Sequence, residues 1–148
     1  MNIYDALKQD HQKVRDILQE LQDSSDGGKN PEKLLSTLKQ ELEIHSTFEE
    51  EVFYPAVAER QEAKEEIADA IDEHDEAMSL LEELEDMDSA SPEWAEQVKT
   101  LSDAINHHVE EEESEIFEMA RETIDQQRAT QMAKEYQQQK QERMKQSA

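Results

Sequence analysis

The sequence predicts an all-α fold: an antiparallel up-down-up-down four-helix bundle with an internal duplication and a C-terminal helical tail. Only two glycines and three prolines occur in 148 residues, a composition typical of long helices rather than of sheets. Apolar residues recur every three or four positions along most of the chain, which places them on one face of each helix. The two halves of the chain also match at a constant separation of 63 residues, which indicates a duplicated pair of helices.

The first predicted helix starts where Asn2 and Asp5 can cap each other's backbone amides. Residues 24–30, rich in serine and glycine, end this helix and turn the chain. An asparagine followed by Pro31 starts the second helix, and Pro55 is expected to kink or stop it. The buried face of the first helix is Ile3, Leu7, His11, Val14, Leu18 and Leu21, and that of the second is Leu34, Leu35, Leu38, Leu42, His45, Glu49, Val52 and Phe53.

The third helix is expected to start near residues 60–63, a boundary that no glycine or proline marks. The polar segment 88–91 ends it, and Pro92 starts the fourth helix as Pro31 starts the second. The fourth helix runs to about Thr123. The buried face of the third helix is Ile67, Ile71, His74, Ala77 or Met78, Leu81 and Leu84, and that of the fourth is Trp94, Val98, Leu101, Ile105, His108, Glu112, Ile116 and Met119.

The chain changes in composition after the fourth helix. We expect residues 1–123 to form the bundle and residues 124–148 to form a polar C-terminal helix or tail. Eight glutamines occur in this last stretch, and few large apolar residues do. Met132 and Tyr136 give it a weakly amphipathic face, so the tail is predicted to be a fifth helix that packs against the bundle or frays from it.

Histidines and glutamates match between the two halves of the chain. A shift of 63 residues places His11 on His74, His45 on His108 and Glu49 on Glu112, together with several leucines. A histidine and a glutamate four positions apart lie on one face of a helix. One such pair is weak evidence in a chain with 39 acidic residues, but its repetition with matching surroundings indicates a site.

Helix lengths place these residues at one level of the bundle. His11 and His45 both lie roughly 20 Å from the turn between their helices, at 1.5 Å per residue. A single core histidine is more often a hydrogen-bonded structural residue than a ligand. Burying the whole set without a cation would cost several kcal/mol for each unpaired charge. We therefore predict a metal site whose ligands are His11, His45, Glu49, His74, His108 and Glu112.

Six protein ligands exceed the number that one tetrahedral zinc uses. Two metals that share both glutamates, with two histidines each and a bridging oxide or hydroxide, would each keep one open position. Nitrogen and oxygen donors with open positions favour two iron ions, with manganese or zinc as the weaker alternatives. No histidine here has a glutamate three residues before it, so a ferritin-like dimetal bundle is excluded.

Other residues near these positions are assigned lesser roles. His107 lies about 100° around its helix from His108 and is a weak candidate for a fifth imidazole ligand. Tyr54 and Phe117 are expected to pack below the carboxylates, with Tyr54 a still weaker candidate ligand. Met78 is expected to line the pocket, because methionine fills irregular gaps in cores.

The set of ligands resembles the hemerythrin-like family, specifically its HHE cation-binding domains. That pattern has a histidine in the first and third helices and His-x-x-x-Glu in the second and fourth, and residues 1–123 fill all of it. The resemblance implies a non-haem di-iron site that binds oxygen, nitric oxide or peroxide, or that stores or senses iron. Oxygen-carrying members have a further histidine and an aspartate where this chain has Met78 and Glu113. The pattern is therefore closer to the iron–sulfur-repair di-iron proteins than to a reversible oxygen carrier.

The net charge and the amino-acid composition limit which partners and which chemistry the protein can have. A net charge of −24 argues against nucleic acid and anionic lipid, because phosphate is repelled. Cysteine is absent, which excludes thiolate nucleophiles and cysteine-ligated clusters. No signal core or apolar run of roughly 20 residues occurs, so we expect a cytoplasmic protein outside the membrane.

The expected function is that of a di-iron protein acting on a small oxidant, either a diatomic molecule or peroxide. The alternative is an iron store or sensor, or an acidic helical binding module that contacts a partner through its tail. Under the first of these functions, deletion of residues 125–148 should leave the metal site intact.

Overall fold

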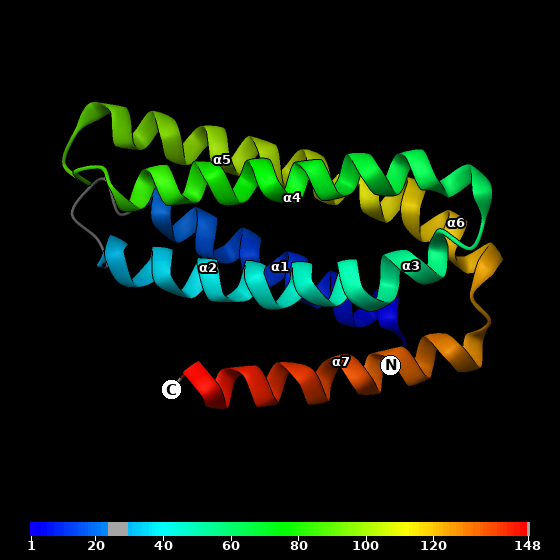
Figure 1. Ribbon diagram of the computed structural model, residues 1–148. Coiled ribbons are helices and arrows are strands. Elements are labelled where there is room, and N and C mark those ends of the chain that lie inside the picture. The colour runs from blue at the N-terminus through cyan, green and yellow to red at the C-terminus, as the bar shows by residue number, and fades with distance from the viewer. Residues whose placement is uncertain (24–29, 148) are drawn as a thin grey trace.

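The computed structural model describes residues 1–23 and 30–147, and these residues are helical apart from short turns. Figure 1 shows the long helices of the bundle side by side and the C-terminal helix along one side of them. The prediction of an all-α bundle is confirmed. The bundle helices are α1 (Ile3–Asp23), α2 (Pro31–Phe48), α4 (Lys64–Glu85) and α5 (Pro92–Glu111); α3 (Tyr54–Val57) and α6 (Phe117–Thr123) extend α2 and α5, and α7 (Gln126–Ser147) is the C-terminal helix.

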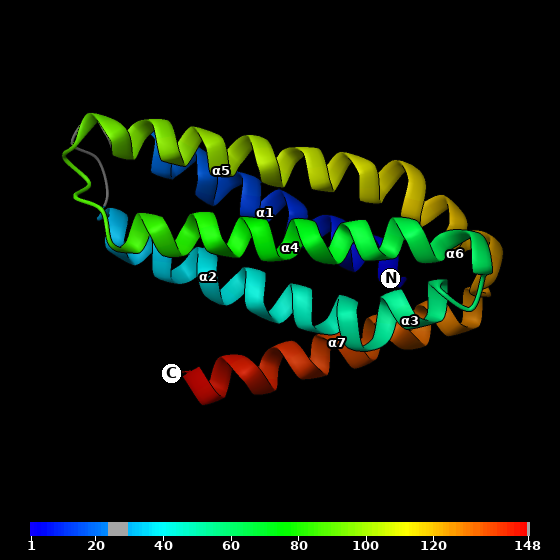
Figure 2. The same cartoon turned by 45° about the horizontal axis from the view of Figure 1, so that its top comes forward.

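The bundle helices run alternately up and down, as the short connections require. Helix α1 packs against α2 and α5, while α4 packs against α5 and α2, so the four helices enclose a common interior (Figures 1 and 2). Among the described helices, none is long and apolar enough to cross a membrane.

The predicted helix starts are confirmed by their capping hydrogen bonds. The Asp5 amide donates to Asn2 Oδ1 at 3.0 Å, and the Asn2 amide donates to Asp5 Oδ2 at 3.2 Å. Asn30 Oδ1 accepts from the Glu32 amide at 3.0 Å, which satisfies an amide that the helix itself leaves without a partner. Ser91 caps α5 in the same way. The predicted turn at residues 24–29 lies outside the described part of the chain.

The other boundaries also fall near the expected positions. Helix α3 ends at Val57, soon after Pro55. A short 3₁₀ turn, η3 (Gln61–Ala63), then leads into α4, so the unmarked boundary at residues 60–63 is confirmed.

Two π-helical segments interrupt the second and fourth bundle helices, a feature the 3.6-residue periodicity did not predict. They are η2 (Glu49–Phe53) and η4 (Glu112–Ile116), and each begins at a predicted glutamate ligand. Pro55 follows the first, but no proline follows the second. Proline is therefore not required for this feature, and its position relates it to the site, since π turns often occur at functional sites.

The buried apolar residues form two clusters, and the predicted ligands lie between them along the helices. One cluster is rich in aromatic residues, including Phe48, Phe53 and Phe117, and lies toward α3, α6 and the start of α1. The other is mainly aliphatic, includes Leu18, Leu38 and Trp94, and lies toward the opposite end of the bundle. The two cores thus hold the ligand-bearing layer from both ends.

Helix α7 packs against the bundle instead of fraying from it. It contacts α1 and α2 and lies along their side, away from α4 and α5 (Figures 1 and 2). Its buried residues are Ala129, Met132, Ala133 and Tyr136. Met132 and Tyr136, which define its predicted amphipathic face, are among them.

Candidate metal centre

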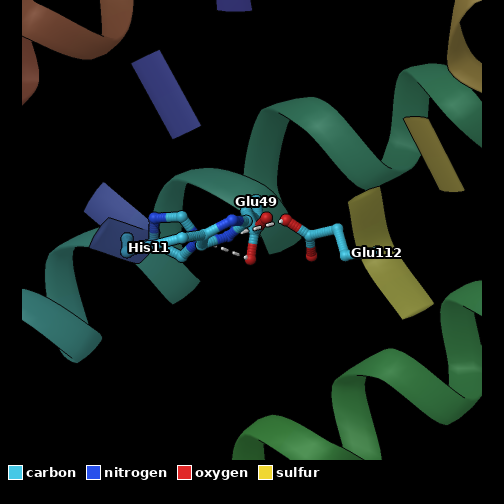
Figure 3. Close-up of side chains that lie close together, drawn as sticks. His11, Glu49 and Glu112 are labelled. Carbon is cyan, nitrogen blue, oxygen red and sulfur yellow. Dashed lines mark ion pairs between the residues drawn. The ribbon is translucent and has the colours of Figure 1, made fainter. Parts of the chain in front are cut away.

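Two overlapping groups of possible metal ligands lie between the two cores, and together they contain all six residues predicted from the sequence. In each group, one possible donor atom from every residue lies within 4.8 Å of the others. Glu49 and Glu112 belong to both groups, and Figure 3 shows them close together beside His11. The first group is His11, His45, Glu49 and Glu112, and the second is Glu49, His74, His108 and Glu112.

All four histidines direct Nε2 toward the two shared carboxylates. His45 and His108 reach the glutamate one turn further along their own helices, as the His-x-x-x-Glu spacing predicts. The other two come from α1 and α4, so the centre depends on the packing of all four helices. The distances are 3.3 Å from His11 Nε2 to Glu112 Oε1, 3.1 Å from His45 Nε2 to Glu49 Oε1, 3.1 Å from His74 Nε2 to Glu49 Oε1, and 3.3 Å from His108 Nε2 to Glu112 Oε2.

A second layer of carboxylates orients the four imidazole rings. Each Nδ1 lies 2.7–3.0 Å from a carboxylate oxygen. A carboxylate accepts, so Nδ1 donates and Nε2 keeps its lone pair for a metal. The pairs are His11 with Glu113, His45 with Asp10, His74 with Glu50, and His108 with Glu73.

The second layer follows the same internal repeat as the ligands, and the sequence analysis did not identify it. Asp10 and Glu73 precede His11 and His74, and they are 63 residues apart. Glu50 and Glu113 follow the two shared glutamates at the same separation. The signal was therefore present in the sequence as duplicated carboxylates beside duplicated ligands, but the many other acidic residues concealed it.

Several buried donor and acceptor atoms lack hydrogen-bond partners within the described residues. Apart from the Tyr4 hydroxyl, which lies outside the centre, they all belong to predicted ligands: His11 Nε2, His45 Nε2, Glu49 Oε2 and Glu112 Oε1. His11 Nε2 and Glu112 Oε1 are only 3.3 Å apart but are not aligned as a hydrogen bond. A buried polar atom without a partner costs about 1–3 kcal/mol, so a bound cation would satisfy these atoms. Imidazole nitrogens and carboxylate oxygens suit iron, manganese or zinc.

Electrostatics favour a charged centre in the metal-free protein. Burial alone would raise the pKa of Glu112, but close polar contacts with Glu49, His108 and His11 hold it well below its usual range. Burial would lower the pKa of His108, yet Glu112, Glu49 and Glu73 raise it to about 9. The pKa of His45 is likewise raised, despite burial, by Glu49 and Asp10. Protons on these imidazoles thus partly balance the carboxylates, and a metal cation would displace them.

Tyr54 reaches the centre, whereas the sequence favoured a packing role for it over that of a ligand. Its hydroxyl donates to Glu112 Oε2 at 2.6 Å and lies 3.2 Å from Glu49 Oε1 and 3.3 Å from His74 Nε2. Burial and both carboxylates raise its pKa well above the usual value. Phe117, its equivalent in the repeat, does pack: its ring stacks on His11 with the centroids 6.3 Å apart.

The π turn explains why α-helical periodicity does not predict the contact of Tyr54 with the carboxylates. In an α-helix, a residue five positions beyond Glu49 would lie about 140° around the axis. In η2, the Tyr54 amide instead donates to the Glu49 carbonyl. This i→i+5 bond returns Tyr54 to the face that carries Glu49. A search restricted to α-helical periodicity could not place the hydroxyl in the site.

His107, considered as a fifth imidazole, points to the surface. Its side chain is 64% exposed, and Nε2 lies 3.0 Å from Glu111. Both groups of clustered ligands omit it, although it joins an exposed cluster with Glu73 and Glu111. His107 points outward because it lies about 100° around the helix axis from the inward-facing His108.

A cavity of about 40 Å³ adjoins all four histidines. That volume suits one or two water-sized molecules. Met78 is among its lining residues, as expected. Most of the other lining side chains are apolar: Val14, Leu42, Ala77, Ile105 and Val109.

The fold and these two ligand groups define a helical-bundle protein built to hold cations. The chain matches the family described as Hemerythrin HHE cation binding domain over residues 2–120. It therefore belongs to the hemerythrin HHE cation-binding family, and the resemblance noted in the sequence is confirmed. Metal binding, with iron as the favoured cation, follows from this membership together with the clustered histidines and glutamates.

Two known proteins are similar to this chain. A crystal structure of a hemerythrin HHE cation binding domain-containing protein from Mycobacterium kansasii superposes with a TM-score of 0.84 and 21% identity, covering 97% of this chain and 87% of that one. A protein named DNA nickase from Nostoc sp. (strain PCC 7120) is 33% identical over 136 residues, which is 92% of this chain. The chain spans only 38% of that relative's length.

Proposed function

We propose that this protein is a non-haem di-iron protein that binds or reacts with a small oxidant: oxygen, nitric oxide or peroxide. The observation that supports it most is the sharing of Glu49 and Glu112 between two groups of ligands that each contain two histidines. Two ions could then be bridged by both carboxylates, with a further oxide or hydroxide bridge. Iron at these positions would supply redox chemistry and open positions for a small ligand.

The protein's own residues prepare the centre for that chemistry. The second-layer carboxylates hold each imidazole with Nε2 inward, so little reorganisation is needed on binding. Tyr54 keeps a proton on its hydroxyl, directed at Glu112 Oε2. The hydroxyl can donate a hydrogen bond only on the side of the centre near His74. On the side near His11, Phe117 occupies the equivalent position in the repeat.

The size and lining of the cavity favour a small ligand. About 40 Å³ accommodates a diatomic molecule or peroxide but not an organic substrate. Met78 lines it at the position where oxygen-carrying relatives have a histidine. We therefore favour reaction with, or sensing of, the small oxidant over reversible oxygen carriage.

Neither nucleic acid nor a membrane is part of the proposal. The net charge of −24 repels phosphate groups on either. The relative from Nostoc is named a DNA nickase, but this chain corresponds to a minor part of it.

Anaerobic loading with Fe(II), followed by metal analysis and optical spectroscopy, tests the proposal. We expect two irons per chain and spectral changes on adding oxygen, nitric oxide or peroxide in turn. The protein incubated with Zn(II) serves as a control that keeps the fold but has no redox response. A single bound metal, or two irons whose spectrum responds to none of the three molecules, would contradict the proposal.

A further inference from the structure

Asp10 is a buried carboxylate on which three helices converge. It is 3% exposed and accepts a hydrogen bond from His45 Nδ1 at 3.0 Å. The Tyr136 hydroxyl and the Lys140 ammonium group, both from α7, also donate to it. A buried carboxylate is stable only when such partners satisfy it. The group that orients His45 is thus itself held by the C-terminal helix.

Packing reinforces this connection. The Tyr136 ring lies 4.6 Å from the Phe48 ring and 6.3 Å from the His45 ring, measured between centroids. Tyr136 is 1% exposed, and Lys140 Nζ lies 5.5 Å from its ring centroid. Helix α7 therefore covers the centre from the side of α1 and α2, the two helices that it contacts. Figure 2 shows its course along this side of the bundle.

The equivalent position in the second half is open by comparison. Glu73 accepts from His108 Nδ1 at 2.8 Å, but its side chain is 22% exposed, against 4% for that of Asp10. It also lies 3.8 Å from the exposed His107 and close to Glu111. Helix α7 lies along the opposite side of the bundle. The internal repeat therefore builds two similar metal positions, and α7 supports one of them.

We propose that α7 contributes to metal binding at the centre. Tyr136 and Lys140 are positioning residues that hold Asp10, and through it His45. The position with His11 and His45 then binds its ion more tightly, and fills earlier, than the position with His74 and His108. This inference rests on the two-metal centre proposed above. It also means that deletion of the tail cannot separate partner binding from metal binding.

Substitutions that preserve the shape of α7 test the inference. Tyr136→Phe removes only the hydroxyl, and Lys140→Met removes the charge but keeps most of the stem. Each variant is loaded anaerobically with Fe(II) and titrated with a competing chelator. We expect one of the two irons to bind more weakly, by less than the roughly 10–100-fold typical when a ligand's own hydrogen-bond partner is lost, because Asp10 itself remains. Lys134→Met, on the exposed face of α7, is the matched control and should change neither affinity.

Ligand variants assign the weakened position. In a His74→Ala background, the remaining tight iron should depend on Tyr136 and Lys140. In a His11→Ala background, the remaining iron should not depend on them. Equal weakening of both irons by the α7 variants, or no weakening of either, would overturn the inference.

A measurement without metal separates this inference from the proposed function. In the iron-free protein, the Nδ1–H signal of His45 in nitrogen-15 NMR should shift and exchange faster in Tyr136→Phe, while that of His108 should stay unchanged. If the wild-type protein holds fewer than two irons but this selective change occurs, the di-iron proposal fails and the role of α7 in orienting His45 stands. Identical behaviour of the two signals would overturn that role.

Discussion

At the scale of single residues, the centre consists of two near-equivalent halves that differ at a few positions. The ligands and the second-layer carboxylates obey the repeat, whereas Tyr54 and Phe117 do not. One hydroxyl therefore lies beside His74, and an apolar ring lies beside His11. Differences of this kind give the two ligand groups distinct surroundings even though their ligand types are the same.

Tyr54→Phe tests the contribution of that hydroxyl. In the iron-free protein, we expect the free energy of unfolding to fall by about 1–3 kcal/mol, since buried carboxylates lose a donor. The six ligands are untouched, so the variant should still bind two irons. Urea unfolding and metal analysis measure both effects. Tyr4→Phe is the control: the Tyr4 hydroxyl is buried and has no hydrogen-bond partner among the residues that the structure describes, so its removal should not destabilise the protein. A larger loss at Tyr4 would contradict this account.

At the scale of elements, the π segments set the direction of the side chains around the carboxylates. Segment η2 begins at Glu49 and η4 begins at Glu112, the two carboxylates that both ligand groups share. The wider turns of these segments place Tyr54 and Phe117 over the centre. Such turns give up regular α-helical hydrogen bonding, which the surrounding packing must offset. We infer that the bound metal contributes to their stability.

Hydrogen exchange can detect this contribution. On removal of iron, the backbone amides of residues 49–54 and 112–117 should lose more protection than those of residues 34–44 and 97–107 in the same helices. The physical reason is that the buried carboxylates of Glu49 and Glu112, only partly balanced by protonated imidazoles, favour local opening once their cation is gone. Comparison of iron-loaded and chelated protein by mass spectrometry measures the difference. A uniform loss along α2 and α5 would show that the metal stabilises the bundle as a whole and not these turns.

At the scale of the whole molecule, metal binding and folding are coupled, because the centre draws ligands from all four bundle helices. Binding to the folded state alone stabilises it by about 2.7 kcal/mol at a free iron concentration 100 times the dissociation constant. For a domain of this size, each kcal/mol raises the melting temperature by about 2–4 °C. The second ion of the proposed di-iron centre would make the effect larger.

We therefore expect iron to raise the melting temperature by about 5–10 °C or more. Glu112→Ala should abolish most of this rise and reduce the iron content, since both positions share this carboxylate. Glu110→Ala, an exposed residue on the same helix, should keep the rise and the iron. Calorimetry of loaded and chelated protein provides the measurement. A full rise in Glu112→Ala would remove this residue from the ligand set.

The sequence by itself determined the bundle, its helix starts, the duplication, and six side chains that meet in one layer. These features follow from helix geometry and from periodic burial, which act over a few residues and repeat along the chain. Only the tertiary structure decided which carboxylate orients each imidazole, that Tyr54 enters the site, and that α7 holds Asp10. The physical reason is that the carboxylate–imidazole pairs and the contacts of α7 with Asp10 join residues far apart in the sequence, where many acidic residues compete for each partner. The position of Tyr54 depends instead on a local change from α to π hydrogen bonding that the 3.6-residue period does not contain.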